Sequence, residues 1–60
     1  MNHIATLTII YYKEHESYSY RYDDKNGNTN ENGMFPTLSE ALGDAAINVK
    51  TFTYIGIEEE

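Results

Sequence analysis

The chain has 60 residues, no cysteine, and 10 acidic against 4 basic side chains, which gives a formal net charge of −6 at pH 7. This length allows one domain over residues 1–60, and the acidic balance argues against direct nucleic-acid binding, because phosphate contacts need clustered Lys and Arg. Disulfide bonds are excluded, no apolar run approaches the roughly 20 residues of a membrane span, and we expect a cytoplasmic protein that does not bind membranes.

Residues 4–12 form the most apolar and most β-prone run of the sequence. Alternation places Ala5, Leu7 and Ile9 on one face, and Ile10 and Tyr12 on the other. Because both faces are apolar enough to be covered, this run predicts a strand in the middle of a sheet.

A hairpin is predicted to follow the first strand. Residues 13–16 are polar and have a suitable length for a turn, and residues 17–23 then alternate strictly. Tyr18, Tyr20 and Tyr22 point to one face of this second strand, which is expected to run antiparallel to the first. Residues 24–33 contain no apolar side chain and many turn-forming ones, so they predict a mobile loop.

The following helix has a defined start. Thr37 is followed three residues later by Glu40, which is the pattern of a capping box. Apolar residues then recur at helical spacing and predict a helix over residues 38–48 that packs an apolar stripe on the sheet. Gly43 within it costs about 1 kcal/mol relative to alanine and could allow close approach of another backbone.

Residues 50–57 predict a third strand, with Phe52 and Tyr54 on one face and Ile55 and Ile57 on the other, and residues 58–60 a solvated tail. The predicted fold is α+β, with element order ββαβ and a three-stranded antiparallel sheet in spatial order 2-1-3. One helix covers one face of this sheet. Because the other face retains a surplus of Tyr, Ile and Phe, we expect a homodimer.

The sequence contains no pattern of a catalytic or metal site. His3 lies near the start and His15 in a turn, whereas nucleophilic catalysis needs a base beside a nucleophile and a zinc site needs several clustered ligands. We therefore predict no enzyme activity, no cofactor and no metal. The three tyrosines of the second strand allow two interpretations, a core face or part of an interface.

The layout of the chain resembles a known family of inhibitors. The residues that carry the resemblance are the alternating run Tyr18-Ser19-Tyr20-Arg21-Tyr22 and the helix opening Leu38-Ser39-Glu40. With the ββαβ order, the acidic balance and the lack of cysteine, they are similar over residues 6–57 to the small uracil-DNA glycosylase inhibitors encoded by Bacillus phages. The resemblance implies a homodimer that occupies the host enzyme's DNA-binding cleft as an acidic DNA mimic and accepts its DNA-intercalating leucine in a hydrophobic pocket.

The pocket of this family does not transfer residue by residue. Where the family has aromatic side chains in the helix, this chain has Ala41 and Ala45, and only Glu40 matches by position. The pocket lining is then expected from Met34, Phe35 and Leu42. The predicted partner-binding residues are Phe35, Glu40, Leu42, Asp44, Tyr20 and Tyr22.

A second resemblance points to another class of binder. The run Thr37-Leu38-Ser39-Glu40-Ala41-Leu42-Gly43-Asp44-Ala45 is similar to the helix start of HicB-type antitoxins. Their truncated RNase H-like domain shares the ββαβ order and neutralises a small basic toxin. This chain departs from them in lacking a Pro-Gly-containing connection before the helix and an appended DNA-binding region.

Overall fold

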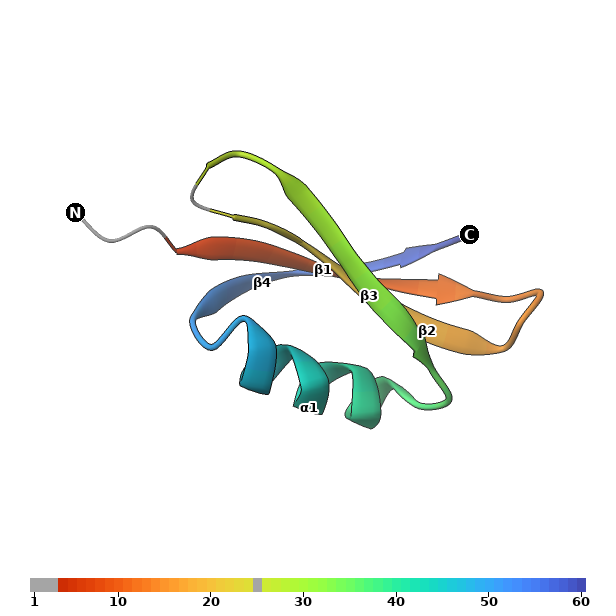
Figure 1. Ribbon diagram of the computed structural model, residues 1–60. Helices are drawn as coiled ribbons and strands as arrows, with labels where there is room; N and C mark the ends of the chain where they lie inside the picture. The colour runs from red at the N-terminus through yellow and green to blue at the C-terminus, as the bar shows by residue number, and fades with distance from the viewer. Residues whose placement is uncertain (1–3, 25) are drawn as a thin grey trace.

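The computed structural model describes residues 4–24 and 26–60 (Figure 1). It contains strands β1 (Ala5–Tyr12), β2 (Ser17–Asp23) and β3 (Thr29–Phe35), helix α1 (Leu38–Asn48) and strand β4 (Phe52–Glu59). The strands form one sheet in the order β3-β2-β1-β4, with α1 on one of its faces. The protein is therefore a small α+β fold built on a mixed sheet.

Strand β1 lies inside the sheet, as its composition predicts. It pairs antiparallel with β2 and parallel with β4, and Leu7, Ile9 and Ile10 have no exposed surface. The predicted turn at residues 13–16 joins β1 to β2, with the His15 N–H donating to the Tyr12 carbonyl over 3.1 Å. The hairpin at the centre of the predicted fold is confirmed.

The prediction of a loop over residues 24–33 is wrong for its second half, because Thr29–Phe35 forms β3. This strand pairs antiparallel with the free edge of β2. Its first residues are polar because an edge strand can point its side chains to water on both faces. Backbone pairing with β2, and not an apolar pattern, defines this strand.

The additional strand also changes the direction of β4. The sequence predicts an all-antiparallel sheet, whereas β4 runs parallel to β1. Because β3 already runs in the direction of β1, α1 carries the chain back along the sheet and β4 starts at the same end as β3. The predicted place of this strand beside β1 is confirmed, and the strand continues through Glu59, where a solvated tail is expected from the sequence.

Helix α1 has the predicted bounds, and the Thr37 half of the predicted capping box is present. The Glu40 N–H donates to Thr37 Oγ1 over 3.1 Å. Ala41 and Ala45 have no exposed surface, and their small size lets the helix pack closely on the sheet. Gly43 is exposed, and no atom lies within 4 Å of where its Cβ would stand, so the close backbone approach expected there is not found within this chain.

One extra residue in β4 changes which side chains face the helix. The register of β4 against β1 shifts between Leu7 and Thr8, which leaves Ile55 as a bulge. Ile57 therefore lies on the same face as Tyr54, although strict alternation predicts opposite faces.

The face of the sheet opposite α1 is polar, whereas the sequence predicts a surplus of apolar side chains there. Ile10 lies on this face and is fully buried. Long side chains lie across the face around it: the Tyr12 hydroxyl donates to Glu31 Oε2 over 2.7 Å, and Arg21 forms an ion pair with Glu31 at 3.6 Å. Met34 is an exposed apolar side chain on this face, and three more exposed apolar side chains, Tyr54, Ile55 and Ile57, lie together along β4.

Candidate protein-binding surface

Three aromatic side chains from three neighbouring strands form a row on the helix-facing side of the sheet. The register pairs Tyr11 of β1 with Tyr18 of β2, and Tyr18 with Phe35 of β3. The Tyr11 and Tyr18 rings lie 4.9 Å apart between centroids with a tilt of 40°. All three side chains are half-buried, so this aromatic row offers apolar surface that a partner can cover.

Carboxylates surround one end of this row. Glu59 pairs with Tyr11 in the register of β1 and β4, and the Glu60 N–H donates to the Tyr11 carbonyl over 2.8 Å. The turn between β1 and β2 lies at the same end of the molecule as the end of β4 (Figure 1). We call this region the acidic end, and its exposed carboxylates belong to Glu14, Glu16, Glu58, Glu59 and Glu60.

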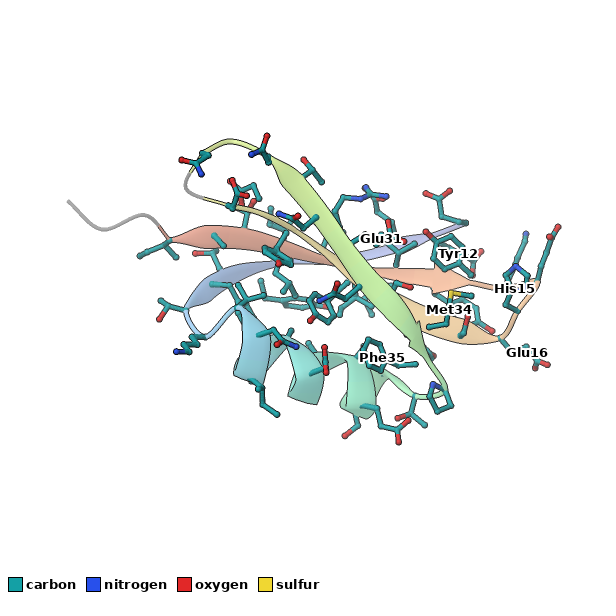
Figure 2. All side chains as sticks on the ribbon, viewed as in Figure 1. Tyr12, His15, Glu16, Glu31, Met34 and Phe35 are labelled. Atoms are coloured by element: carbon teal, nitrogen blue, oxygen red, sulfur yellow. The ribbon has the colours of Figure 1, made fainter. Side chains whose placement is uncertain are left out.

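A chain of polar contacts continues from the acidic end across the opposite face of the sheet. Arg21 contacts Glu31 at 3.6 Å and Glu58 at 3.4 Å, and so links β2 to both β3 and β4. Figure 2 shows Tyr12 and Glu31 on this face, where the hydrogen bond to the Glu31 carboxylate raises the pKa of the Tyr12 phenol. These contacts fix the position of two carboxylates near the acidic end.

A cluster of polar groups around the buried Tyr20 joins the helix to the sheet. The Tyr20 hydroxyl donates to Asp44 Oδ2 over 2.6 Å and accepts from Asn32 Nδ2 over 2.8 Å. Asn48 Nδ2 donates to the same Asp44 oxygen over 2.8 Å. Burial raises the pKa of Tyr20, and the bond to Asp44 raises it further. The phenol therefore remains a donor and joins β2, β3 and α1.

Several predicted binding residues lie together in the structure, but they mainly form part of the hydrophobic core. Tyr20 stacks with Phe35 and with Tyr22, each at 6.0 Å between ring centroids. Tyr20 has no exposed surface, so it cannot contact a partner directly and can only support the exposed residues that do. Asp44 is half-buried against the Tyr20 hydroxyl, which gives this carboxylate a structural partner.

The other predicted residues are more dispersed. Leu42 is half-buried and packs against the core, and Glu40 is exposed in the first turn of α1, where its carboxylate accepts from Thr37 Oγ1 over 3.4 Å. Met34 lies on the opposite face, with its sulfur 3.7 Å from Ser17 Oγ, and so does not share a pocket with Phe35 (Figure 2). The structure adds the aromatic row and the acidic end to the candidate site.

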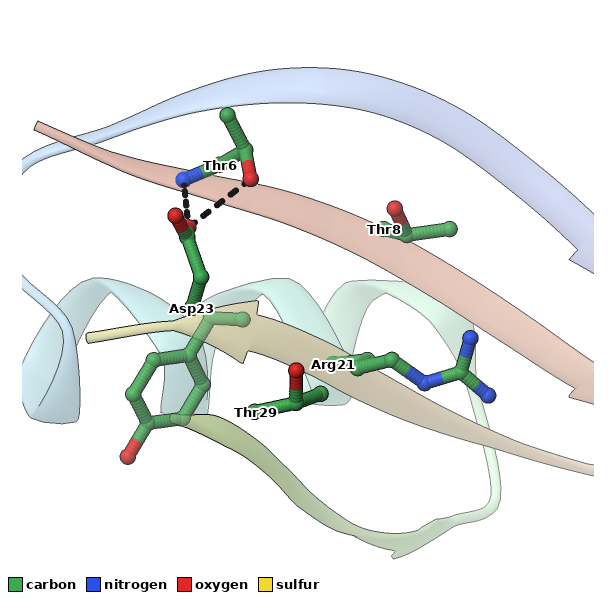
Figure 3. Close-up of a pocket in the computed structure, with 6 residues that line it drawn as sticks. Thr6, Thr8, Arg21, Asp23 and Thr29 are labelled. Atoms are coloured by element: carbon green, nitrogen blue, oxygen red, sulfur yellow. Dashed lines mark hydrogen bonds between the residues drawn. The ribbon is translucent and has the colours of Figure 1, made fainter. Parts of the chain in front are cut away.

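A shallow pocket lies on the polar face, away from the aromatic row (Figure 3). Its volume of about 100 Å³ is smaller than the ~300–1,000 Å³ of typical ligand pockets. Within it, Asp23 Oδ1 accepts from the Thr6 N–H over 2.5 Å and from Thr6 Oγ1 over 2.8 Å. The carboxylate is already occupied by the protein's own donors, so this pocket offers little to a ligand.

The remaining candidate features of the described residues are the histidine, metal-ligand and membrane-spanning ones. His15 is exposed in the turn after β1, and His3 lies outside the described residues. Among residues 4–24 and 26–60, no group of three or more His, Cys, Asp or Glu side chains could hold a metal ion. No helix in this described part of the chain has the length and apolar character needed to cross a membrane.

Comparison with known proteins adds no family to this description. A scan against protein-family models, a search of curated proteins and a search of solved structures found no match for the chain. The fold and composition define a small acidic α+β protein with a four-stranded mixed sheet.

Proposed function

We propose that this protein is an inhibitor of uracil-DNA glycosylase that acts in the cytoplasm of a bacterial host cell and occupies the enzyme's DNA-binding cleft. The observation that carries the proposal is the aromatic row with carboxylates at its end. The identity of the target rests on the sequence resemblance. The protein acts by binding, as a homodimer, and carries out no reaction itself.

The acidic end supplies the encounter with the target. A cleft that holds DNA phosphates is positively charged, and a surface of exposed carboxylates such as Glu14, Glu16 and Glu59 is complementary to it. Such complementarity speeds association at low salt. Exposed ion pairs contribute only about 0–1 kcal/mol each, so charge alone does not hold the complex.

The aromatic row supplies the lasting part of the contact. Tyrosine and other large aromatic side chains are enriched among the residues that dominate binding energy, because they bury a large area at a small entropic cost. Tyr11, Tyr18 and Phe35 are half-buried before binding, so their orientation is already fixed. Leu42 and Glu40 extend the surface along α1 in this proposal.

Inhibition of uracil excision is the direct test. We expect an equimolar amount of the protein to abolish cleavage of a uracil-containing oligonucleotide by the glycosylase of the host species. Cleavage at the full rate in the presence of folded protein would show that the inhibitor proposal is wrong. The antitoxin alternative would then be tested by co-expression with small basic toxins encoded beside the gene.

Two variants with the same change in net charge separate the acidic end from the rest of the surface. Glu59→Gln lies at the acidic end, and Asn26→Lys lies in the loop at the opposite end of the sheet. We expect Glu59→Gln to slow association and to weaken its salt dependence, and Asn26→Lys to have a smaller effect. Equal effects would mean that net charge alone matters.

The aromatic row requires a different readout. Tyr18→Leu keeps an apolar side chain in the row and removes the ring that contacts Tyr11. We expect mainly faster dissociation of the complex, because mutations in the centre of an interface act through the dissociation rate. A melting curve of the free variant shows whether the fold is retained, and an unchanged dissociation rate would place the contact elsewhere.

A further inference from the structure

Strand β4 is an open edge of the sheet with an apolar surface. β1 pairs with one side of β4, and β4 is the last strand of the sheet, so the backbone donors and acceptors of its other side point outward. Tyr54, Ile55 and Ile57 along this strand are exposed by 47%, 64% and 53%. An exposed apolar edge strand is a template for pairing with another strand.

Helix α1 leaves this edge uncovered. The helix packs mainly on β2 and β3, on the other half of the sheet. Tyr54 and Ile57 are on the helix-facing side of β4 and nevertheless remain exposed. The apolar surface therefore continues from the edge of β4 onto the neighbouring half of the helix-facing side.

We propose that β4 pairs with β4 of a second copy of this chain, antiparallel and about a twofold axis near Ile55, so that two sheets join into one. This inference rests on the homodimer in the proposed function and assigns that dimer to one strand. It does not depend on the identity of the target.

The charges at the two ends of β4 favour the antiparallel direction. Glu58, Glu59 and Glu60 lie at the end of the strand, and Lys50 lies just before its start. Parallel pairing would align the acidic residues of the two copies, and like charges on neighbouring strands are destabilising. Antiparallel pairing instead brings each Lys50 toward Glu60 of the second copy.

A second copy of this chain has a strand with the same charges, Lys50 before its start and glutamates at its end, so it is the partner that fits β4. A twofold interface uses the same patch on both subunits, so every favourable contact occurs twice. A domain of this size buries only about 60% of the surface of its unfolded chain, and pairing the two β4 strands removes further apolar side chains from water. A strand from an unrelated protein would need the matching basic residue independently.

Sedimentation velocity over a hundredfold range of concentration tests the dimer, with two lysine substitutions as a matched pair. Ile55→Lys places two like charges near the twofold axis, whereas Ile47→Lys changes an isoleucine on α1 that is 73% exposed and lies outside β4. We expect Ile55→Lys to raise the dissociation constant at least about tenfold and Ile47→Lys to leave it unchanged. A wild-type protein that remains monomeric, or equal effects of both variants, would overturn the inference.

A charge exchange tests the direction of pairing without altering the apolar residues. Lys50→Glu should weaken the dimer about threefold to tenfold, and adding Glu60→Lys in the same chain should restore it. Both residues are exposed, so neither change disturbs the core. If the double variant is no tighter than Lys50→Glu alone, the antiparallel arrangement is wrong.

The glycosylase assay keeps this inference distinct from the proposed function. If the wild-type protein is a dimer but leaves uracil excision at the full rate, the inhibitor proposal is wrong and the β4 interface is retained. A wild-type protein that inhibits as a monomer would show that the β4 interface and the homodimer are wrong, whereas the glycosylase would remain the target.

Discussion

The two edge strands of the sheet differ in how they are held and in what they expose. On β3, Asn32 bonds to the Tyr20 hydroxyl and Glu31 contacts both Arg21 and Tyr12, so side chains as well as backbone attach this strand to its neighbours. On β4, Ile55 and Ile57 are exposed. Polar and charged side chains protect a sheet edge from pairing, and β3 carries them, whereas β4 presents an apolar edge.

Both edges also contain a bulge with a glycine, and the two glycines serve different needs. On β3 the register shifts between Tyr18 and Ser19, and a Cβ on Gly33 would collide with the Ser19 side chain. On β4, Gly56 has a φ of 154°, which favours glycine, but no atom lies within 4 Å of where its Cβ would be. Close packing therefore requires glycine on β3, and backbone conformation favours it on β4.

The largest effect is expected from Gly33→Ala. The added methyl group meets Ser19, which is only 1% exposed and cannot move away freely, so β3 must shift from β2. We expect a loss of about 1–3 kcal/mol in the free energy of unfolding, as for other overpacked sites. Urea denaturation of the variant and the wild type measures this loss.

Gly43→Ala is the matched control for that substitution. It adds the same methyl group in the middle of α1, where the space is open. We expect stabilisation by about 0.5–1 kcal/mol, because alanine is the better helix former. If both alanine variants change stability in the same direction, the contact between Gly33 and Ser19 does not hold β3 in place.

An effect smaller than that of Gly33→Ala is expected from Tyr20→Phe, which tests the side-chain attachment of β3. The substitution keeps the buried ring and removes the hydroxyl that bonds Asp44 and Asn32. We expect a loss of about 1–2 kcal/mol, because the half-buried partners lose a hydrogen bond without gaining water freely. Tyr22→Phe on the same face is the control, and an equal loss there would contradict a special role for the Tyr20 hydroxyl.

The sequence correctly predicts those elements whose own side chains show a periodic apolar pattern. The alternating tyrosines of β2 and the helical spacing of Ala41 and Ala45 give β2 and α1 with correct bounds. Strand β3 has no such pattern, because its partners are the free edge of β2 and the polar groups of Arg21 and Tyr20. Without β3, the direction of β4 could not be derived either.

The candidate site shows the same limit. Tyr11 and Tyr18 could have been paired from the sequence, since an antiparallel hairpin with a turn at residues 13–16 places them opposite each other. Phe35 joins their row only when residues 29–35 form a strand. Of the two interpretations of Tyr20, core face or part of an interface, the structure shows the core, because Tyr20 is buried in one cluster with Ala41 and Ala45 of α1.

The smallest effect concerns the loop that leads into β3, where Asp24 organises the turn. Asp24 Oδ1 accepts from the Asn28 N–H and the Asn26 N–H, each over 2.9 Å. The bond from Asn28, followed by the one from Asn26, lowers the pKa of the Asp24 carboxyl from its ordinary value of 3.8. This contribution to stability is therefore complete above pH 3.8 and is lost as the pH falls through the lowered pKa of the folded protein. We expect Asp24→Asn to have a lower urea midpoint than the wild type at neutral pH, and the difference to shrink in acid. A difference that stays constant between neutral and acidic pH would show that the charge of Asp24 does not stabilise the turn, and that β3 depends on its contacts with β2 alone.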